Sequence, residues 1–402
     1  MEQAAGIAGE SMQGYTLEQV VSGALSQQQA LAVWRLPLQT EVQACISFAP
    51  QTTSAIPELE TSPTGFLFCP FVTDGAEGNI FLKADIRYSS LTKQLTIDPD
   101  APATQVNLFT EALAQAENEK PGIWPIPANR AHHSNRNQET FTAAVSLAVD
   151  SIRAESMEKV VLSRISTSAL PTDFSLLKAF GKMLVAYPNA FVSLVAIPGV
   201  GTWLGASPEI LVSVDQHEVF KTVALAGTQP LCEDGSTANA IWRQKEIEEQ
   251  GMVERYVLSC FKKLRLREYS EVGPRTVIAG NLMHLRTDFK VDLKEVDFPT
   301  LGTDMLRLLH PTSAVCGLPK EPALRFILDH EGYDRSYYSG FLGPVNSEVG
   351  THLFVNLRCM QLLSDQAVLY AGAGITGESS ADKEWQETQH KLQTMLRILS
   401  EF

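Results

Sequence analysis

Two pairs of glutamates are the side chains in this sequence best suited to bind a metal ion. Glu246 and Glu249 stand in the segment KEIEEQGMV, and Glu384 and Glu387 stand in KEWQETQHK. Residues three apart lie on the same face of an α-helix, so each pair presents its two carboxylates together. Carboxylate oxygens with no soft ligand among them suit Mg²⁺, which keeps several waters and usually shares its coordination shell with an anion.

The first pair lies on a helical face that is otherwise apolar. At about 100° per residue, Glu246 and Glu249 share this face with Trp242, Val253 and Val257. Burying ionised carboxylates among apolar side chains costs several kcal/mol unless a cation or hydrogen bonds compensate. A metal ion would compensate, and pairing with core arginines is the alternative.

The second pair allows a simpler explanation as well. Glu384 and Glu387 share a stripe with Lys391, separate from the apolar stripe of the same helix. Such a stripe is also typical of a solvated helix face with ion pairs. If the two helices face one another, however, the four carboxylates can hold one ion between them.

A glycine-rich turn offers a competing interpretation. The segment GAGITG, from Gly372 to Gly377, fits the fingerprint of a dinucleotide-binding turn. That fold needs another strand after the next helix, carrying an acid near the ribose. After Gly377 the sequence predicts one helix, over residues 381–401, and no further strand. A dinucleotide oxidoreductase is therefore only an alternative, and we expect Gly372 and Gly374 to let backbone approach a ligand.

The composition excludes several classes of partner. The chain has 402 residues and a formal net charge of −14, and no run of Lys or Arg offsets this charge. We therefore expect neither nucleic acid nor a membrane as a partner. The cysteines are scattered singly without a CxxC pair, which predicts reduced thiols and a cytoplasmic location. We also expect no secretory signal and no membrane-spanning segment.

The elements that must position these side chains indicate an α+β fold. Residues 1–135 contain short β-like runs, and the polar segment ANRAHHSNRNQET marks the expected boundary with a second region, 136–402. In that region, predicted helices over 140–155, 238–264 and 381–401 alternate with runs of consecutive strands. Strands joined by short turns favour antiparallel pairing.

The chain from about residue 138 onward resembles the chorismate-utilising enzymes, a family that includes isochorismate, anthranilate, aminodeoxychorismate and salicylate synthases. The resemblance rests on several motifs in the same order: KVVLSR at 159, WLGASPEIL at 203, LAGT at 225, HPTSAVCGLPK at 310, YYSGFLGPV at 337, LFVNLRC at 353, and AGAGI with EWQETQHK. It implies two facing antiparallel sheets with helices outside, and a variable N-terminal part integrated in the same fold. It also implies that AGAGI is a substrate loop, with no nucleotide.

The resemblance implies a magnesium site and a substrate site. Glu249 and Glu387 match direct Mg²⁺ ligands, and Glu246 and Glu384 match residues that support the ion through water. The residues that match the pocket for the two carboxylates and the ring of chorismate are Gly227, Thr228, His310, Arg358, Ala373, Gly374 and Lys391. One departure is Gln250, which stands where the family commonly has a histidine next to the metal ligand.

Two further residues point to one reaction within the family. Lys159 matches the base of isochorismate and salicylate synthases, and Glu209 matches the general acid. Many aminodeoxychorismate synthases have a nucleophilic lysine where this chain has Ala226. We therefore expect a Mg²⁺-dependent isochorismate synthase of menaquinone or catechol siderophore biosynthesis, a monomer without a glutaminase subunit. Salicylate synthase and a non-catalytic chorismate-binding homologue are the alternatives.

Overall fold

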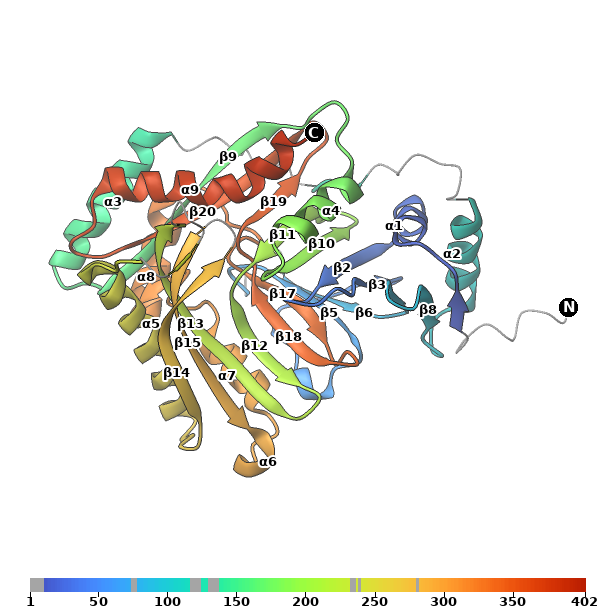
Figure 1. Ribbon diagram of the computed structural model, residues 1–402, viewed down its shortest axis with the longest axis horizontal. Helices are drawn as coiled ribbons and strands as arrows, with labels where there is room; N and C mark the ends of the chain where they lie inside the picture. Colours follow the sequence, from blue (N-terminus) through green and yellow to red (C-terminus); the bar gives the residue numbers. More distant parts are fainter. Residues whose placement is uncertain are drawn as a thin grey trace, which may run out of the picture.

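Two antiparallel β-sheets face each other and carry helices on their outer faces (Figure 1). The computed structural model describes residues 11–73, 78–115, 124–128, 137–231, 236–237, 240–279 and 282–402. The predicted α+β class with two facing sheets is confirmed.

The larger sheet has eleven strands within the described residues, all paired antiparallel. Their order is β1 (Ser11–Gln13), β8 (Gln94–Ile97), β7 (Ile86–Ser89), β3 (Gln43–Ser47), β2 (Ala30–Arg35), β10 (Phe191–Ile197), β11 (Gly201–Ser207), β19 (Cys359–Leu362), β20 (Gln366–Ile375), β9 (Lys159–Ala169) and β16 (Gly317–Leu318). β9 thus lies between the ten-residue strand β20 and the two-residue strand β16.

The smaller sheet has nine strands in the part of the chain that is described. Their order is β14 (Ser270–Ala279), β15 (Leu282–Asp292), β13 (Val219–Pro230), β12 (Ile210–Asp215), β18 (Gly350–Val355), β17 (Phe341–Val345), β5 (Gly65–Cys69), β6 (Asn79–Lys83) and β4 (Gln51–Thr53). The register between β13 and β15 shifts between Ala226 and Gln229. Gly227, at φ +66°, lies inside this irregularity, where a residue without Cβ is favoured.

Strands from the N-terminal part lie in both sheets. β2 pairs with β10 in the larger sheet, and β5 pairs with β17 in the smaller one. Both sheets are therefore built from segments on either side of the predicted boundary. The boundary itself, at residues 135 and 136, lies outside the described residues.

Each outer face is covered by its own helices. An apolar cluster joins the larger sheet to α1 (Leu17–Ser26), α2 (Ala103–Gln115), α4 (Leu176–Ala186) and α9 (Ala381–Ser400). A second cluster joins the smaller sheet, the start of β9 and the end of β20 to α3 (Gln138–Arg153), α5 (Gln244–Lys263), α7 (Leu301–Leu309) and α8 (Lys320–His330). The short helices η1 (Leu59–Thr61) and α6 (Leu293–Val296) complete the set in the described ranges. Figure 1 shows α3 beside α9, two helices that are in contact.

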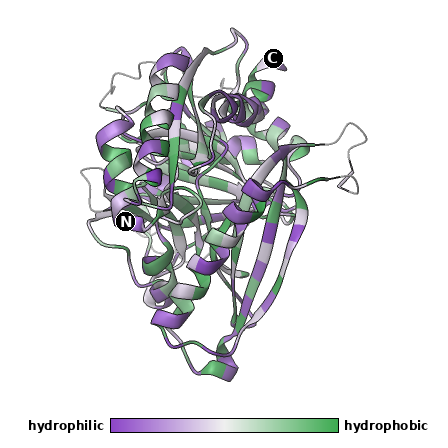
Figure 2. Cartoon of the chain, turned by 90° about the vertical axis from the view of Figure 1, so that its left-hand side faces the viewer, coloured by the Kyte–Doolittle hydropathy of each residue, from purple (hydrophilic) through white to green (hydrophobic). Residues whose placement is uncertain are grey.

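The layer between the sheets is rich in aromatic rings. Phe191 of the larger sheet stacks on Phe354 of the smaller one, with ring centroids 4.2 Å apart. Figure 2 shows apolar residues concentrated along the inner strands, whereas the outer helices alternate between polar and apolar faces. This distribution matches helices that bury one face against a sheet. Within the described residues, no helix combines the length and the apolar character that a membrane span requires.

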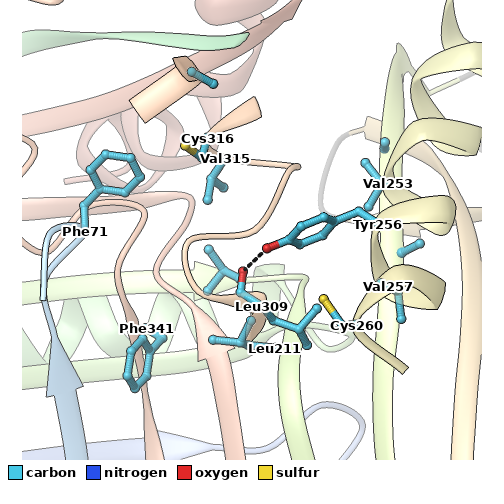
Figure 3. Packing of buried hydrophobic residues seen from close by; sticks show 14 of the residues in the cluster. Phe71, Leu211, Val253, Tyr256, Val257, Cys260, Leu309, Val315, Cys316 and Phe341 are labelled. Carbon is cyan, nitrogen blue, oxygen red and sulfur yellow. Dashed lines mark hydrogen bonds between the residues drawn. The ribbon is translucent and has the colours of Figure 1, made fainter. Parts of the chain in front are cut away.

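Helix α5 is fixed to the rest of the molecule by a hydrogen bond from its middle. Tyr256 points from α5 toward the end of α7, and its hydroxyl donates to the Leu308 carbonyl at 2.7 Å and to the Leu309 carbonyl at 3.4 Å, the second contact being the one drawn in Figure 3. The predicted helix over 238–264 was too long at its start, because α5 begins at Gln244. The Glu246 carboxylate accepts the N–H of Arg243 at 2.8 Å, and this capping contact favours the observed start.

Candidate active site

A cavity lies where the ends of β9, β13 and β20 meet helices α5 and α9. The predicted site residues that line it are Glu209, Gly227, Thr228, Glu249, Arg358, Gly374 and Lys391. They come from segments up to 182 positions apart in the sequence, between Glu209 and Lys391 (391 − 209). The fold therefore brings together side chains that the sequence keeps far apart.

Lys159 forms a buried ion pair with Glu249 at the edge of this cavity. The Lys159 side chain is fully buried, and its Nζ donates a hydrogen bond of 2.9 Å to Oε1 of Glu249. Burial acts to raise the pKa of the Glu249 carboxyl, but Lys159, with the charges of Lys245 and Lys391, outweighs this effect and the pKa is lowered. The predicted base and a predicted metal ligand are thus direct partners.

Glu209 follows β11 and lies in the cavity wall, only 4% exposed. Burial raises the pKa of its carboxyl to about 7, although the positive charges of Lys159 and Lys391 act in the opposite direction. A carboxyl group with this pKa carries a proton in about half of the molecules at neutral pH. It can therefore donate a proton to a leaving group.

Arg358 supplies a buried guanidinium that lacks a full set of acceptors. Its Nη1 is buried without a hydrogen-bond partner among the described residues, and burial lowers its pKa to about 10. A buried N–H donor of this kind is costly unless it is paired. A carboxylate in the cavity would pair it, since carboxylates match the planar fork of a guanidinium.

Lys391 and Glu387 lie one helical turn apart on α9. The Lys391 Nζ donates to Oε1 of Glu387 at 2.6 Å and to the Gly372 carbonyl at 2.8 Å. Lys391 thereby joins α9 to β20, next to the cavity.

Glu384 is the most deeply buried of the four predicted metal-site acids, at 1% exposure. Its Oε1 accepts from the Nζ of Lys245 at 2.5 Å, and its Oε2 is buried without a partner in the described part of the chain. The solvated-face alternative for this stripe of α9 does not hold at Glu384. Glu246, by contrast, uses its carboxylate to cap α5.

The acidic residues fit a hard cation in their chemistry. Glu249, Glu384 and Glu387 each attract a lysine ammonium, and Glu384 Oε2 still lacks a donor. In the described residues, no three Asp, Glu, His or Cys side chains form a ready-made metal-binding group. Oxygen donors of negative charge are nevertheless the ligands that Mg²⁺ prefers. A Cβ on Gly374 would lie 2.4 Å from Glu249 Oε1, so only glycine leaves room for this carboxylate.

A histidine that the sequence analysis did not single out, His284, lines the cavity. His310 is absent from the cavity lining, and its Nε2 lies 3.2 Å from the Phe71 carbonyl, with its ring packed against Phe341. Ala373 likewise turns its side chain into the apolar core, while its neighbour Gly374 lines the cavity.

His284 lines the cavity from β15 and connects two predicted substrate residues. Burial, with the charges of Arg358 and Lys391, lowers its pKa to about 3, so the ring is neutral at pH 7. Its Nδ1 lies 2.8 Å from the Gly227 carbonyl and donates to it, and its Nε2 lies 3.4 Å from Arg358 Nη2. A lone histidine inside the apolar run LMHL was the available signal in the sequence.

The glycine-rich turn belongs to the antiparallel strand β20, which pairs with β9 and β19. A dinucleotide fingerprint requires a parallel strand that leads into a helix, so that alternative is wrong. A family model described as chorismate binding enzyme matches residues 46–400. The chain belongs to the family of chorismate-binding enzymes. The match spans most of the chain and includes strands of the N-terminal part.

Individual relatives of this chorismate-binding enzyme are similar over most of its length. It is 30% identical over 269 residues to the isochorismate synthase EntC of Escherichia coli, and the aligned region covers 65% of this chain and 67% of EntC. It is 27% identical over 344 residues to the isochorismate synthase MenF of Escherichia coli, covering 81% and 77%. The family membership makes this protein an enzyme that acts on chorismate.

Solved structures share the fold. The menaquinone-specific isochorismate synthase MenF from Escherichia coli superposes with a TM-score of 0.76 at 22% identity, over 98% of this chain and 95% of that structure. Anthranilate synthase component I from Streptococcus pneumoniae gives a TM-score of 0.63 at 18% identity, over 98% and 93%. The two-sheet architecture therefore serves more than one reaction, and the reaction must be argued from the site.

Proposed function

We propose that this protein is a Mg²⁺-dependent isochorismate synthase, which adds water at C2 of chorismate while the C4 hydroxyl leaves. The observation that carries the proposal is a fully buried lysine whose charge acts on a buried carboxyl in the cavity wall, and the pKa of that carboxyl is raised to about 7. Lys159 opens β9 and Glu209 lies between β11 and β12, and the Lys159 charge acts on the Glu209 carboxyl. Relatives named as isochorismate synthases support the same reaction.

Lys159 is the proposed base. In its neutral form the amine takes a proton from the water that attacks C2. Its side chain is fully buried at the start of β9. Gly317 fixes this position, since a Cβ there would lie 2.2 Å from the Lys159 carbonyl oxygen.

Glu209 is the proposed general acid. Its carboxyl, with a pKa of about 7, donates a proton to the C4 hydroxyl as the bond to C4 breaks. The product carries the hydroxyl at C2, and the double bonds shift between the two positions. Base and acid thus act on opposite ends of the same conjugated system.

The remaining cavity residues hold the two carboxylates of chorismate. Gly227 and Thr228 bind the ring carboxylate, and Arg358 and Lys391, with backbone at Gly374, bind the enolpyruvyl carboxylate. Neutral His284 keeps Arg358 in place by accepting from its guanidinium. These contacts orient the ring between the base and the acid.

In this proposal Glu249 and Glu387 hold Mg²⁺ directly, and Glu246 and Glu384 hold it through water. The bound ion supplies positive charge for the ring carboxylate. Gln250 follows Glu249, and its amide donates to the Ala224 carbonyl and to Thr287 Oγ1, both at 3.1 Å. Gln250 thereby fixes α5 against β13 and β15, in place of the family's usual histidine.

Isochorismate as the released product fits either menaquinone or catechol siderophore biosynthesis, and we propose a cytoplasmic monomer without a glutaminase subunit. The test is to incubate the purified protein with chorismate and Mg²⁺ and to separate the products by chromatography. Isochorismate should accumulate, and EDTA should stop its formation. Pyruvate and salicylate as major products would instead identify a salicylate synthase, and unchanged chorismate would indicate a binding homologue.

A further inference from the structure

A buried ion pair outside the cavity joins two segments that line it. Glu331 ends α8 and Arg335 follows four residues later, with exposures of 1% and 2%. The guanidinium contacts both carboxylate oxygens, Nη2 to Oε1 at 2.6 Å and Nε to Oε2 at 2.7 Å. Isolated charges at these positions would be very costly, so the pair must be kept together.

The pair also occupies backbone groups of β9 that no strand covers. At the start of β9, the short strand β16 is the neighbour, and the Val161 N–H donates to the Cys316 carbonyl at 2.8 Å. Beyond this point Arg335 Nη2 donates to the Val161 carbonyl at 2.7 Å, and Glu331 Oε1 accepts the Ser163 N–H at 2.6 Å. The side chains of the pair thus continue the hydrogen-bond ladder where β16 ends.

The same guanidinium also reaches the loop that precedes β16. Its Nη1 donates to the Val315 carbonyl at 2.8 Å. Val161 and Val315 both line the cavity, and Val161 lies two residues after Lys159 on β9. One side chain therefore sets the spacing between the strand of the base and a wall of the substrate cavity.

We propose that the Glu331–Arg335 pair is a positioning device that locks the Lys159 strand to the Val315 loop at the separation that catalysis needs. This inference rests on the proposed function. It predicts that loss of the pair displaces the base relative to the bound ring, whereas the groups that bind the substrate carboxylates keep their places. Loss of the pair should then lower kcat and leave KM nearly unchanged.

The decisive variant is the double change Glu331→Leu with Arg335→Met, which removes both charges and leaves no unpaired ion in the core. We expect a folded protein whose kcat falls by roughly 10²-fold, the order that a misplacement of about 1 Å costs. KM should change by less than about 3-fold, a small part of that loss. Wild-type kcat in the folded double variant would overturn the proposal.

Hydrogen exchange supplies a readout that needs no reaction. The Ser163 N–H loses its acceptor in the double variant, so a peptide covering residues 159–165 should exchange faster, while residues 191–197 in β10 should not change. If the wild-type protein forms no isochorismate, the proposed function fails, and hydrogen exchange still tests the positioning role of the Glu331–Arg335 pair. If the wild type is active and protection of 159–165 is unchanged in the variant, only the positioning role fails.

Two single variants secure the interpretation. Arg335→Lys keeps the charge but cannot reach Val161, Val315 and Glu331 together, so kcat should fall with the fold retained. Undiminished kcat would contradict the proposal even if the double variant does not fold.

The control is Arg35→Met. Arg35 is also buried and donates to carbonyls, those of Leu184, Tyr187 and Ala190, none of which lines the cavity. This control should lose stability but keep the kcat of the folded enzyme.

Discussion

The Nζ of Lys159 lies 2.9 Å from Oε1 of Glu249, so the proposed base and a proposed metal ligand form one buried ion pair. The pair spans 90 residues of sequence and connects β9 to α5. Chemistry at Lys159 and cation binding at Glu249 are therefore expected to influence each other.

Replacing the base should stop the reaction without removing the substrate site. Lys159→Ala is expected to lower turnover by about 10²–10⁴-fold, the usual contribution of a positioned acid or base. Chorismate should still bind, because Arg358, Lys391 and Thr228 remain. Product chromatography and calorimetric titration with chorismate measure the two properties separately. Undiminished isochorismate formation would remove Lys159 from the mechanism.

The pH profile should report Glu209. A general acid must be protonated, and burial raises the pKa of this carboxyl to about 7, so kcat/KM should fall as the pH rises above 7. Glu209→Gln should be nearly inactive at every pH. Initial rates between pH 5.5 and 9 test this expectation, and a rate that is constant up to pH 9 would argue against Glu209 as the acid.

The same pKa predicts how stability depends on pH. The folded state holds the Glu209 proton more tightly than the unfolded chain, whose ordinary value is 4.5. The stabilisation is therefore complete below pH 4.5 and is lost as the pH rises toward 7. Glu209→Gln should gain stability relative to wild type by up to about 3 kcal/mol at pH 8. Urea unfolding at pH 5 and pH 8 should show this difference widening with pH, and a constant difference would contradict it.

Cation binding should depend on Glu249 but not on its exposed neighbour. Removing a residue that hydrogen-bonds to a metal ligand lowers metal affinity roughly 10–100-fold. Glu249→Gln changes the proposed ligand itself, so it should lower the affinity for Mg²⁺ at least as much. Glu248→Gln is the matched control, since Glu248 is exposed one residue earlier on α5. Calorimetric titration with MgCl₂ alone provides the measurement. Equal affinities in the two variants would rule out Glu249 as a ligand.

Gly374 should not tolerate even a methyl group. In Gly374→Ala the new Cβ would lie 2.4 Å from Glu249 Oε1, so the carboxylate must move and activity should fall by at least about 10-fold. Gly181→Ala in α4 is the control, because its Cβ would meet no atom within 4 Å. That control should retain activity and gain about 0.5–1 kcal/mol of stability. Full activity in Gly374→Ala would show that the Glu249 position does not matter.

The fold class was predictable because strand runs and motif order are local properties. The alternating pattern of β-like runs indicated antiparallel sheets, and the sheets are antiparallel throughout the described residues. Helical spacing identified the glutamate pairs. Only the fold, however, brings Glu249 and Gly374 to one cavity. The roles of Lys159 and Glu209 stay predictions, although both side chains are buried and the Lys159 charge acts on the Glu209 carboxyl.

Other features could not be read from local patterns. His310 and His284 are both buried histidines, and only the fold decides that the ring of His284 faces the cavity. The pair of Lys245 and Glu384 joins residues 139 positions apart, and periodicity within one helix carries no information about it. The Glu331–Arg335 pair could not be predicted for the same reason, since the carbonyls that accept from Arg335 lie on β9 and on the loop containing Val315.

The strands that the N-terminal part adds to both sheets have a practical consequence. A shortened protein beginning near residue 137 would leave β10 and β17 each without a neighbour on one side. Bare strand edges recruit strands from other molecules, so such a fragment should aggregate rather than work as a minimal catalyst. The strands of the first third of the chain therefore protect β10 and β17 from pairing with other molecules, and this part cannot be exchanged as a separate module.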